Sequence, residues 1–169
     1  YHLVVPGKRL RGATIFFKNQ SVTATATFLM AATLARGQTI LKNCALEPEI
    51  INLIEFLVLA GAKITGVGTH TLVIRGGQLL KTARPYRVLP DRIEAGSFAI
   101  LGALTNRRFS LTHCRPEHLG SLWQIFSELG LRVTSRGSSV TITRTGSTFR
   151  PVQLKTHEYP GFPTDLQAP

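Results

Sequence analysis

The sequence carries one carboxylate near its C-terminal end in a setting suited to proton transfer. Asp165 stands in the segment 161–167 (GFPTDLQ), after a proline, where a turn gives way to an expected helix start. One interpretation is a helix cap, because aspartate accepts hydrogen bonds from the first backbone amides of a helix. The other is a general base, because a carboxylate directed into a cleft can take a proton from a hydroxyl group. The residues themselves leave both interpretations open.

A second group of candidates lies in a turn between a predicted strand, 12–15, and the predicted helix start, 21–25. Backbone N–H groups at a helix N-terminus bind anions, and Lys18 adds positive charge. Ser21 is equally well explained as a simple helix cap. The pattern predicts an anion-binding turn made of Lys18, Asn19, Gln20, Ser21, Val22 and Thr23.

A third group lies in the segment 89–94 (LPDRIE). Asp91 can cap a following helix, with Glu94 three residues later completing a capping box. Of this group, Arg92 is predicted to face a ligand site. Glu47 and Glu49 are interpreted first as acidic residues that favour the positive end of a helix dipole.

The elements that must position these residues occur twice. Residues 26–75 align with residues 96–144, at an offset of 70 that becomes 69 after one deletion. The aligned pairs include Phe28 and Phe98, Leu34 and Leu104, Cys44 and Cys114, Gly61 and Gly130, and Arg75 and Arg144. Each copy favours two helices, a strand between them and a final hairpin, which indicates an α/β fold of β-α-β-α-β-β units.

Specific elements are expected in each copy. The first copy has helices at 24–35 and 47–61, a strand at 39–42 and a hairpin of 62–65 and 71–75; the second has helices at 93–105 and 116–129, a strand at 108–112 and a hairpin of 131–135 and 139–144. Strands at 13–17 and 86–89 are expected before the copies, and another at 152–156. The predicted repeat units span 11–78 and 84–148, and a third unit starts within 150–169. The first helix of each copy is apolar nearly all round, which is typical of a buried helix.

Composition favours an anionic partner without choosing one. The chain of 169 residues has a formal net charge of +11 and is 43% hydrophobic, which fits a globular domain. No apolar run is long enough to span a bilayer, no signal peptide is evident, and the two cysteines lack metal-ligand spacing. We therefore expect a cytoplasmic protein without metal, cofactor or membrane partner. A nucleic-acid-binding basic module is an alternative, disfavoured because no basic stripe with surface aromatics is evident.

Three segments together resemble the UDP-N-acetylglucosamine enolpyruvyl transferases: 46–50 (LEPEI), 87–97 (RVLPDRIEAGS) and 161–169 (GFPTDLQAP). The resemblance covers nearly the whole chain. It implies an inside-out α/β barrel in which three such units surround a pseudo-threefold axis, with helices inside and sheets outside. Family members are more than twice as long, so residues 1–169 would be one partial domain from the middle of a longer protein. Helix surfaces meant for a missing unit would then be exposed, which predicts marginal stability or self-association.

The resemblance also implies a function. The family transfers the enolpyruvyl group of phosphoenolpyruvate to the 3-hydroxyl of UDP-N-acetylglucosamine and releases phosphate, in the first committed step of peptidoglycan synthesis. It implies that Asp165 is the base and that the turn before the first helix contacts the UDP-sugar. Thr23 replaces a family glycine, Leu46 a common arginine, and Asn19 a lysine of some members. These departures keep a non-catalytic paralogue open.

Further implications concern what lies outside the matched region. The family's proton-donating loop and its phosphoenolpyruvate-binding Lys and Arg residues are outside it, so the isolated chain is expected to be inactive. An enzyme like 5-enolpyruvylshikimate-3-phosphate synthase shares the architecture and remains an alternative, although its motifs differ from LPDRIE and FPTD.

Overall fold

The structure is a computed structural model that describes residues 5, 7, 9–82 and 84–169. The chain divides into two compact units, Tyr1–Val88 (unit 1) and Leu89–Pro169 (unit 2). The boundary falls within the segment predicted as the second repeat unit, 84–148, after its fifth residue. Most of the segment on which the signal-peptide prediction rests, at the extreme N-terminus, lies outside the described residues.

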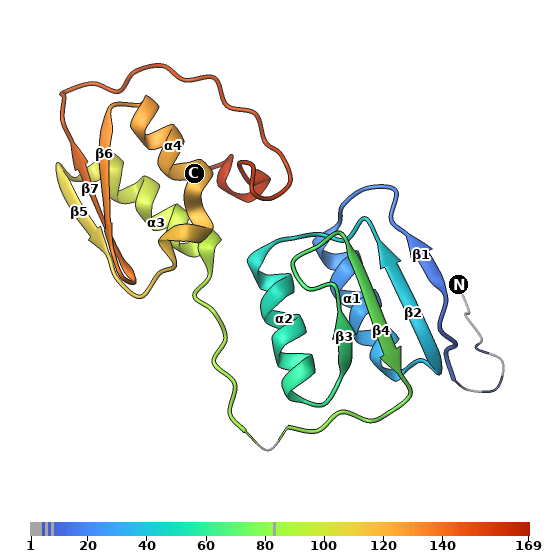
Figure 1. The fold of residues 1–169 in the computed structure, drawn as a ribbon. Helices are drawn as coiled ribbons and strands as arrows, with labels where there is room; N and C mark the ends of the chain where they lie inside the picture. Colours follow the sequence, from blue (N-terminus) through green and yellow to red (C-terminus); the bar gives the residue numbers. More distant parts are fainter. Residues whose placement is uncertain (1–4, 6, 8, 83) are drawn as a thin grey trace. The chain divides into compact units, whose positions relative to one another are not determined.

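Unit 1 is a four-stranded sheet with two helices packed against it (Figure 1). Its elements are β1 (Thr14–Phe16), α1 (Val22–Leu34), β2 (Gly37–Lys42), α2 (Pro48–Leu59), β3 (Lys63–Thr65) and β4 (Thr71–Gly76). The strand order is β1-β2-β4-β3; β1 is parallel to β2, and the other pairs are antiparallel. Its core is built around the fully buried residues Leu29, Leu41, Ile54, Leu72 and Ile74.

Unit 2 repeats this arrangement with three strands. Its elements are α3 (Arg92–Thr105), β5 (Arg108–Leu111), the 3₁₀ helix η2 (Pro116–Leu119), α4 (Gly120–Glu128), β6 (Leu131–Arg136), β7 (Ser139–Arg144) and the 3₁₀ helix η3 (Thr164–Leu166). The order β5-β7-β6 matches β2-β4-β3 of unit 1. Leu122, Val140 and Ile142 are at the centre of its core.

The two units share an order of helices and strands, and three expected features are wrong. No strand forms at 86–89: the ring of Tyr86 packs against Phe56 of α2, and its hydroxyl lies 2.9 Å from Glu55 Oε2. Unit 2 therefore has no counterpart of β1. The predicted helix 116–129 is divided into η2 and α4, and 152–156 forms no strand but a single bridge from Thr156 to Phe162. The third repeat unit stays a prediction, because residues 150–169 belong to unit 2 here.

In each unit, the strand that follows the first helix is succeeded by a residue with the same left-handed backbone conformation. Asn43 and His113, at matching positions, adopt φ of 60° and 59°. The following amides are then paired across to the hairpin, Cys44 N with His70 O and Cys114 N with Ser138 O, both at 3.0 Å. Both cysteines are buried and free, in agreement with the structural role expected for them.

Burial raises the pKa of both the Cys44 and the Cys114 thiol. We expect each to react with a soluble disulfide reagent at least about 100-fold more slowly in the folded chain than in urea, since the thiolate is the nucleophile. Stability should fall as pH rises above about 8.5, because unfolded thiols ionise there while folded ones stay protonated. Stopped-flow labelling and urea midpoints on both sides of that pH test this. Equal labelling rates in the two states would contradict it.

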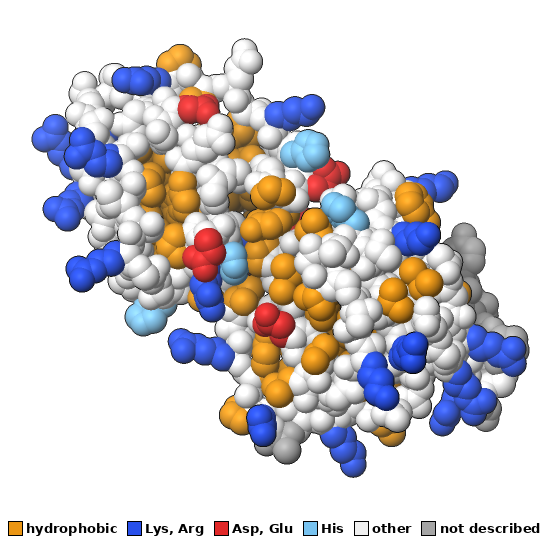
Figure 2. Space-filling model, in the orientation of Figure 1, with side chains coloured by type: hydrophobic (Ala, Val, Ile, Leu, Met, Phe, Trp, Pro, Cys, Tyr) orange, Lys and Arg blue, Asp and Glu red, His pale blue; other side chains and the backbone are white. Residues whose placement is uncertain are grey.

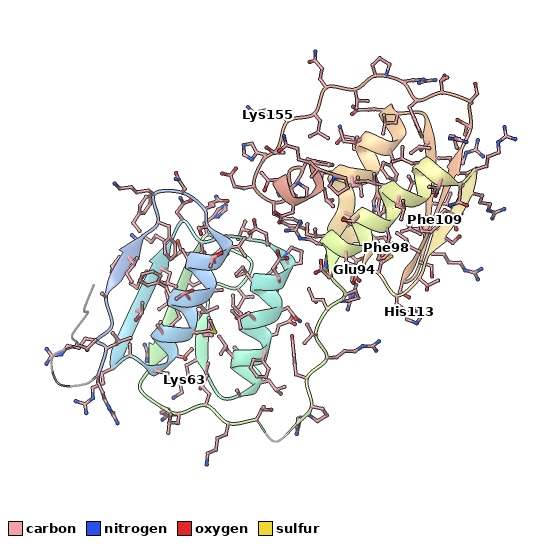
Figure 3. The ribbon with its side chains drawn as sticks, turned by 180° about the vertical axis from the view of Figure 1, so that it is seen from behind. Lys63, Glu94, Phe98, Phe109, His113 and Lys155 are labelled. Carbon is pink, nitrogen blue, oxygen red and sulfur yellow. The ribbon has the colours of Figure 1, made fainter. Side chains whose placement is uncertain are left out.

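The first helix of each unit is buried on only one side, so the prediction of burial all round is wrong for this chain. On α1, Phe28 is 42% exposed and Leu34 is 51% exposed; on α3, the aligned Phe98 and Leu104 are 50% and 56% exposed. Figure 3 shows Phe98 projecting from α3 one turn after Glu94. The same positions are uncovered in both copies, which matches the expectation of helix surfaces left without a partner.

We expect these apolar surfaces to make the isolated chain self-associate, because large exposed apolar patches are normally covered. The double substitution Leu34→Gln and Leu104→Gln should shift the chain toward monomer, raising the dissociation constant about tenfold or more for the apolar area lost. Sedimentation velocity over a concentration series measures the shift. Leu79→Gln is the control, because Leu79 is 85% exposed and lies outside both helices. An unchanged distribution for the double variant would contradict the expectation.

Candidate active site

Three loops of unit 1 meet at one edge of its sheet. Because β1 and β2 are parallel, the loops that follow them, 17–21 and 43–47, leave the sheet at the same edge. Because β4 is antiparallel to β2, the hairpin residues that precede it reach this edge too. Ala45 N donates to Thr25 Oγ1 at 3.1 Å, which ties the second loop to the first turns of α1.

Side-chain hydrogen bonds join these loops. Asn43 Nδ2 donates to Phe17 O at 2.9 Å, and Gln20 Nε2 donates to Asn43 Oδ1 at 3.4 Å. His70 Nδ1 lies 2.9 Å from Cys44 O and 3.4 Å from Gln20 Nε2. A carbonyl oxygen can only accept, so the shorter contact places the proton on Nδ1. Asn43 thus fixes the turn predicted to bind an anion, and His70 fixes the neighbouring loop at Cys44; the sequence singled out neither residue.

In the structure, the predicted anion-binding turn leads into helix α1, as expected. Ser21 is the N-cap of α1, and its hydroxyl accepts from Ala24 N at 3.2 Å. Lys18 and Asn19 are exposed, and Val22 packs against the core. Thr23 lies in the first helical turn with its side chain exposed, so the backbone there does not require glycine. The capping interpretation of Ser21 is confirmed, and the cap leaves other N–H groups of that turn for a ligand.

Glu47 lies at the same edge of the sheet, at the end of the loop that follows β2. It occupies the N-cap position of α2 and is only 8% exposed. Its Oε2 atom has no hydrogen-bond partner among the described residues. A buried carboxylate oxygen without a partner is costly, which makes Glu47 a candidate to accept a hydrogen bond from a ligand. The only sequence signal was the acidic pair around Pro48.

In unit 2, Asp91 and Arg92 take different roles. Asp91 caps α3, with Oδ1 accepting from Ile93 N at 2.7 Å and from Glu94 N at 3.1 Å, as the capping interpretation predicted. Arg92, the first residue of α3, places its guanidinium carbon 5.7 Å from the centre of the Tyr159 ring. Arg92 and the segment that leads to Asp165 are thereby brought together.

Asp165 lies in the first turn of η3 and is exposed. The N-cap of η3 is Pro163, and no side chain caps it, so the helix-cap interpretation of Asp165 is wrong. Its position is set by the next residue, because Leu166 is buried against α3 at Gly96, where an added Cβ would lie 2.6 Å from Leu166 Cδ1. The preceding residues, Tyr159 and Phe162, border a hollow of about 470 Å³ beside α4.

Of the predicted site residues, those from Lys18 to Thr23 belong to unit 1, and Arg92 and Asp165 belong to unit 2. The described residues contain no group of His, Cys, Asp and Glu side chains arranged to hold a metal ion. Among the same residues, no helix could cross a membrane. On the face shown in Figure 2, Lys and Arg side chains are scattered over both units and form no continuous stripe.

Comparison with known proteins defines the class of protein first. The family of EPSP synthase (3-phosphoshikimate 1-carboxyvinyltransferase) matches residues 1–169, so the chain belongs to this family of carboxyvinyl transferases. Its fold is that of the solved enolpyruvyl transferase NikO from Streptomyces tendae, with a TM-score of 0.83 at 25% identity over 98% of this chain and 43% of that one. EPSP synthase from Acinetobacter baumannii shares the fold with a TM-score of 0.58. The predicted fold class is confirmed.

The curated relatives share one name and point to one kind of transferase within this family. The chain is 49% identical, over 95% of its length, to UDP-N-acetylglucosamine 1-carboxyvinyltransferase of Koribacter versatilis. It is 44% identical to the proteins of the same name from Acidobacterium capsulatum and Hydrogenovibrio crunogenus, over 95% and 99% of its length. The chain spans only 36% to 40% of the length of these relatives.

Proposed function

We propose that the chain is part of a longer enzyme that transfers the enolpyruvyl group of phosphoenolpyruvate to the 3-hydroxyl of UDP-N-acetylglucosamine. The observation that carries this proposal is the identity of 44% to 49% with enzymes named for this reaction, over nearly all of the chain. The exposed Asp165, which no helix needs as a cap, supports it. The enzyme would act in the cytoplasm and supply peptidoglycan synthesis, and through it cell shape and division.

In the proposed reaction, the sugar 3-oxygen attacks the phosphate-bearing carbon of phosphoenolpyruvate while its proton passes to the Asp165 carboxylate. The methylene carbon gains a proton from a donor outside this chain. Loss of a proton from that carbon and of phosphate from its neighbour then gives the enolpyruvyl ether. A positioned carboxylate base contributes on the order of 10²–10⁴ in rate.

The turn of unit 1 would hold the anionic UDP-sugar. The N–H groups at the start of α1 and the ammonium group of Lys18 supply partial and full positive charge. Asn43 keeps the turn in place through Gln20 and Phe17. Arg92, ordered on Tyr159, would supply a planar cation for a carboxylate or phosphate.

The test is phosphate release by the longer protein. We expect release from phosphoenolpyruvate when UDP-N-acetylglucosamine is present and none with shikimate 3-phosphate in its place. The chain of residues 1–169 should release none with either. Release with shikimate 3-phosphate would favour the other branch of the family, and no release with either substrate would favour a non-catalytic paralogue.

A further inference from the structure

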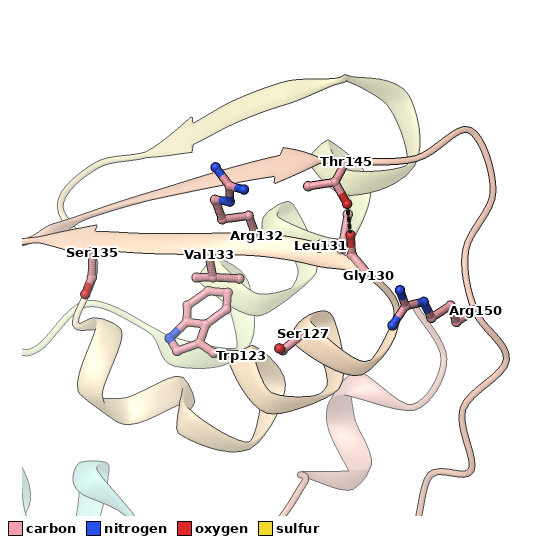
Figure 4. A pocket seen from close by; sticks show the side chains of 9 residues that line it. All are labelled: Trp123, Ser127, Gly130, Leu131, Arg132, Val133, Ser135, Thr145 and Arg150. Atoms are coloured by element: carbon pink, nitrogen blue, oxygen red, sulfur yellow. Dashed lines mark hydrogen bonds between the residues drawn. The ribbon is translucent and has the colours of Figure 1, made fainter.

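Strand β6 and helix α4 of unit 2 border an open groove of about 620 Å³ (Figure 4). Trp123 and Ser127 line it from α4, and Val133 and Ser135 line it from β6. Arg150 stands at one end, beside Gly130 and the start of β6. None of the residues proposed for the enolpyruvyl reaction borders this groove.

One wall of the groove is an unpaired strand edge. Among the described residues, β6 pairs with β7 and with no other strand. The two-residue turn at 137–138 makes Arg136 and Ser139 the closing pair, so hydrogen-bonded pairs then recur at every second residue. The backbone N–H and C=O groups of Leu131, Val133 and Ser135 consequently point away from β7. An edge of this kind is a template for another strand.

The other wall is a fixed aromatic ring. Trp123 Nε1 donates to Pro116 O at 2.7 Å, and the ring packs edge-on against Phe126 with centroids 5.8 Å apart. Figure 4 draws the ring directly below Val133, and both side chains line the groove. A side chain of an added strand would meet preformed apolar surface there, and binding would require little ordering of the protein.

The end of the groove is positively charged. Arg150 N donates to Leu129 O at 3.2 Å, which anchors the residue beside the start of β6. Within the described part of the chain, the side chains of Arg150 and Arg132 have no ion-pair partner. A strand added antiparallel to β6 would have its C-terminal end here, so a carboxylate at that end would meet Arg150.

Unit 1 provides an internal comparison. Lys81 holds the position of Arg150, with its N–H donating to Ala60 O at 3.1 Å. There, however, the corresponding edge strand β3 has 3 residues where β6 has 6. The hollow beside it is about 110 Å³. Among the described residues, the hollow beside β3 is therefore much smaller than the groove beside β6.

We propose that the groove between β6 and α4 binds an extended peptide segment of a partner protein. The segment adds to β6 as an antiparallel strand, packs an apolar side chain against Trp123 and Val133, and places a carboxylate on Arg150. Main-chain hydrogen bonds give this mode its affinity, and the pocket and the charge give it selectivity.

The proposal is tested by fluorescence anisotropy with the chain of residues 1–169. The probe is a labelled peptide of alternating valine and threonine that ends in glutamate with a free carboxylate. We expect saturable binding, weakened about tenfold or more by N-methylation of the alternate residues that face β6, because each methyl group removes a donor. N-methylation of the residues in the other register should have little effect. Arg150→Gln should weaken binding about tenfold, and the matched Lys81→Gln should not.

Two further measurements determine which carboxylate of the peptide contacts Arg150. Loss of affinity on amidating the C-terminus assigns a terminal carboxylate to Arg150, and loss on replacing glutamate by glutamine assigns an acidic side chain; either supports the proposal. It is overturned if the probe does not bind, if both N-methylated peptides bind equally, or if Arg150→Gln binds like the unmodified chain. Loss of probe binding as the chain is concentrated into a dimer would also overturn it, because a second copy would then be the occupant.

Discussion

Asp165→Asn in the longer protein is expected to lower kcat for phosphate release by about 10²–10⁴-fold. The amide keeps the shape of the carboxylate and cannot accept the proton of the sugar hydroxyl. Substrate affinity should change little, because the lost interaction develops in the transition state. Asp165 is exposed and caps no helix, so the melting temperature should stay within about 2 °C. Steady-state kinetics together with thermal unfolding separate the two effects.

Glu158→Gln is the matched control for this experiment. Glu158 is an exposed carboxylate of the same C-terminal segment, with Oε2 2.8 Å from His157 Nδ1. Its substitution should leave kcat unchanged, because exposed ion pairs contribute little. If Asp165→Asn retains most of the activity, Asp165 is not the base. If both variants lose activity to the same degree, the segment is needed only for its structure.

Gly76→Ala is expected to destabilise unit 1 by at least about 3 kcal/mol. Gly76 ends β4 at the point where the strand passes the last turn of α1. A Cβ there would lie 2.1 Å from Ala32 O and 2.4 Å from Ala35 O. Both contacts are with backbone atoms, which cannot move aside as a flexible side chain can, so the strand and the helix must separate. For a domain of this size the melting temperature should fall by on the order of 15 °C, which calorimetry would measure.

The control is the same substitution at Gly120, the first residue of α4. Gly120 has helical φ and ψ, and beyond its chain neighbours and its own helix backbone no atom lies within 4 Å of an added Cβ. Alanine there should be neutral or stabilise the chain by about 0.5–1 kcal/mol, through its higher helix propensity. If Gly76→Ala melts at the same temperature as Gly120→Ala, the close packing of β4 on α1 is not what the structure indicates.

The sequence by itself determined the repeat and most of its elements. Helix starts at Ser21 and Asp91 and helix ends before Gly61 and Gly130 were predictable, because caps and left-handed glycines act on backbone groups only a few residues away. Both glycines indeed have positive φ, 102° and 89°. The family and the fold class were likewise evident from short stretches of sequence.

Only the tertiary structure decided which of these segments meet. Asn43 is distant from the turn at 18–21 in sequence and reaches it because both lie at the same edge of the sheet. Tyr86 packs on α2, whereas local propensity favoured a strand. The cap interpretation of Asp165 failed for a similar reason, since the burial of Leu166 on Gly96 fixes where the last 3₁₀ helix lies. Which side chains come into contact depends on the surfaces that remain exposed after the helices and strands have packed together. These surfaces are formed by residues far apart in sequence, so a local sequence pattern does not predict them.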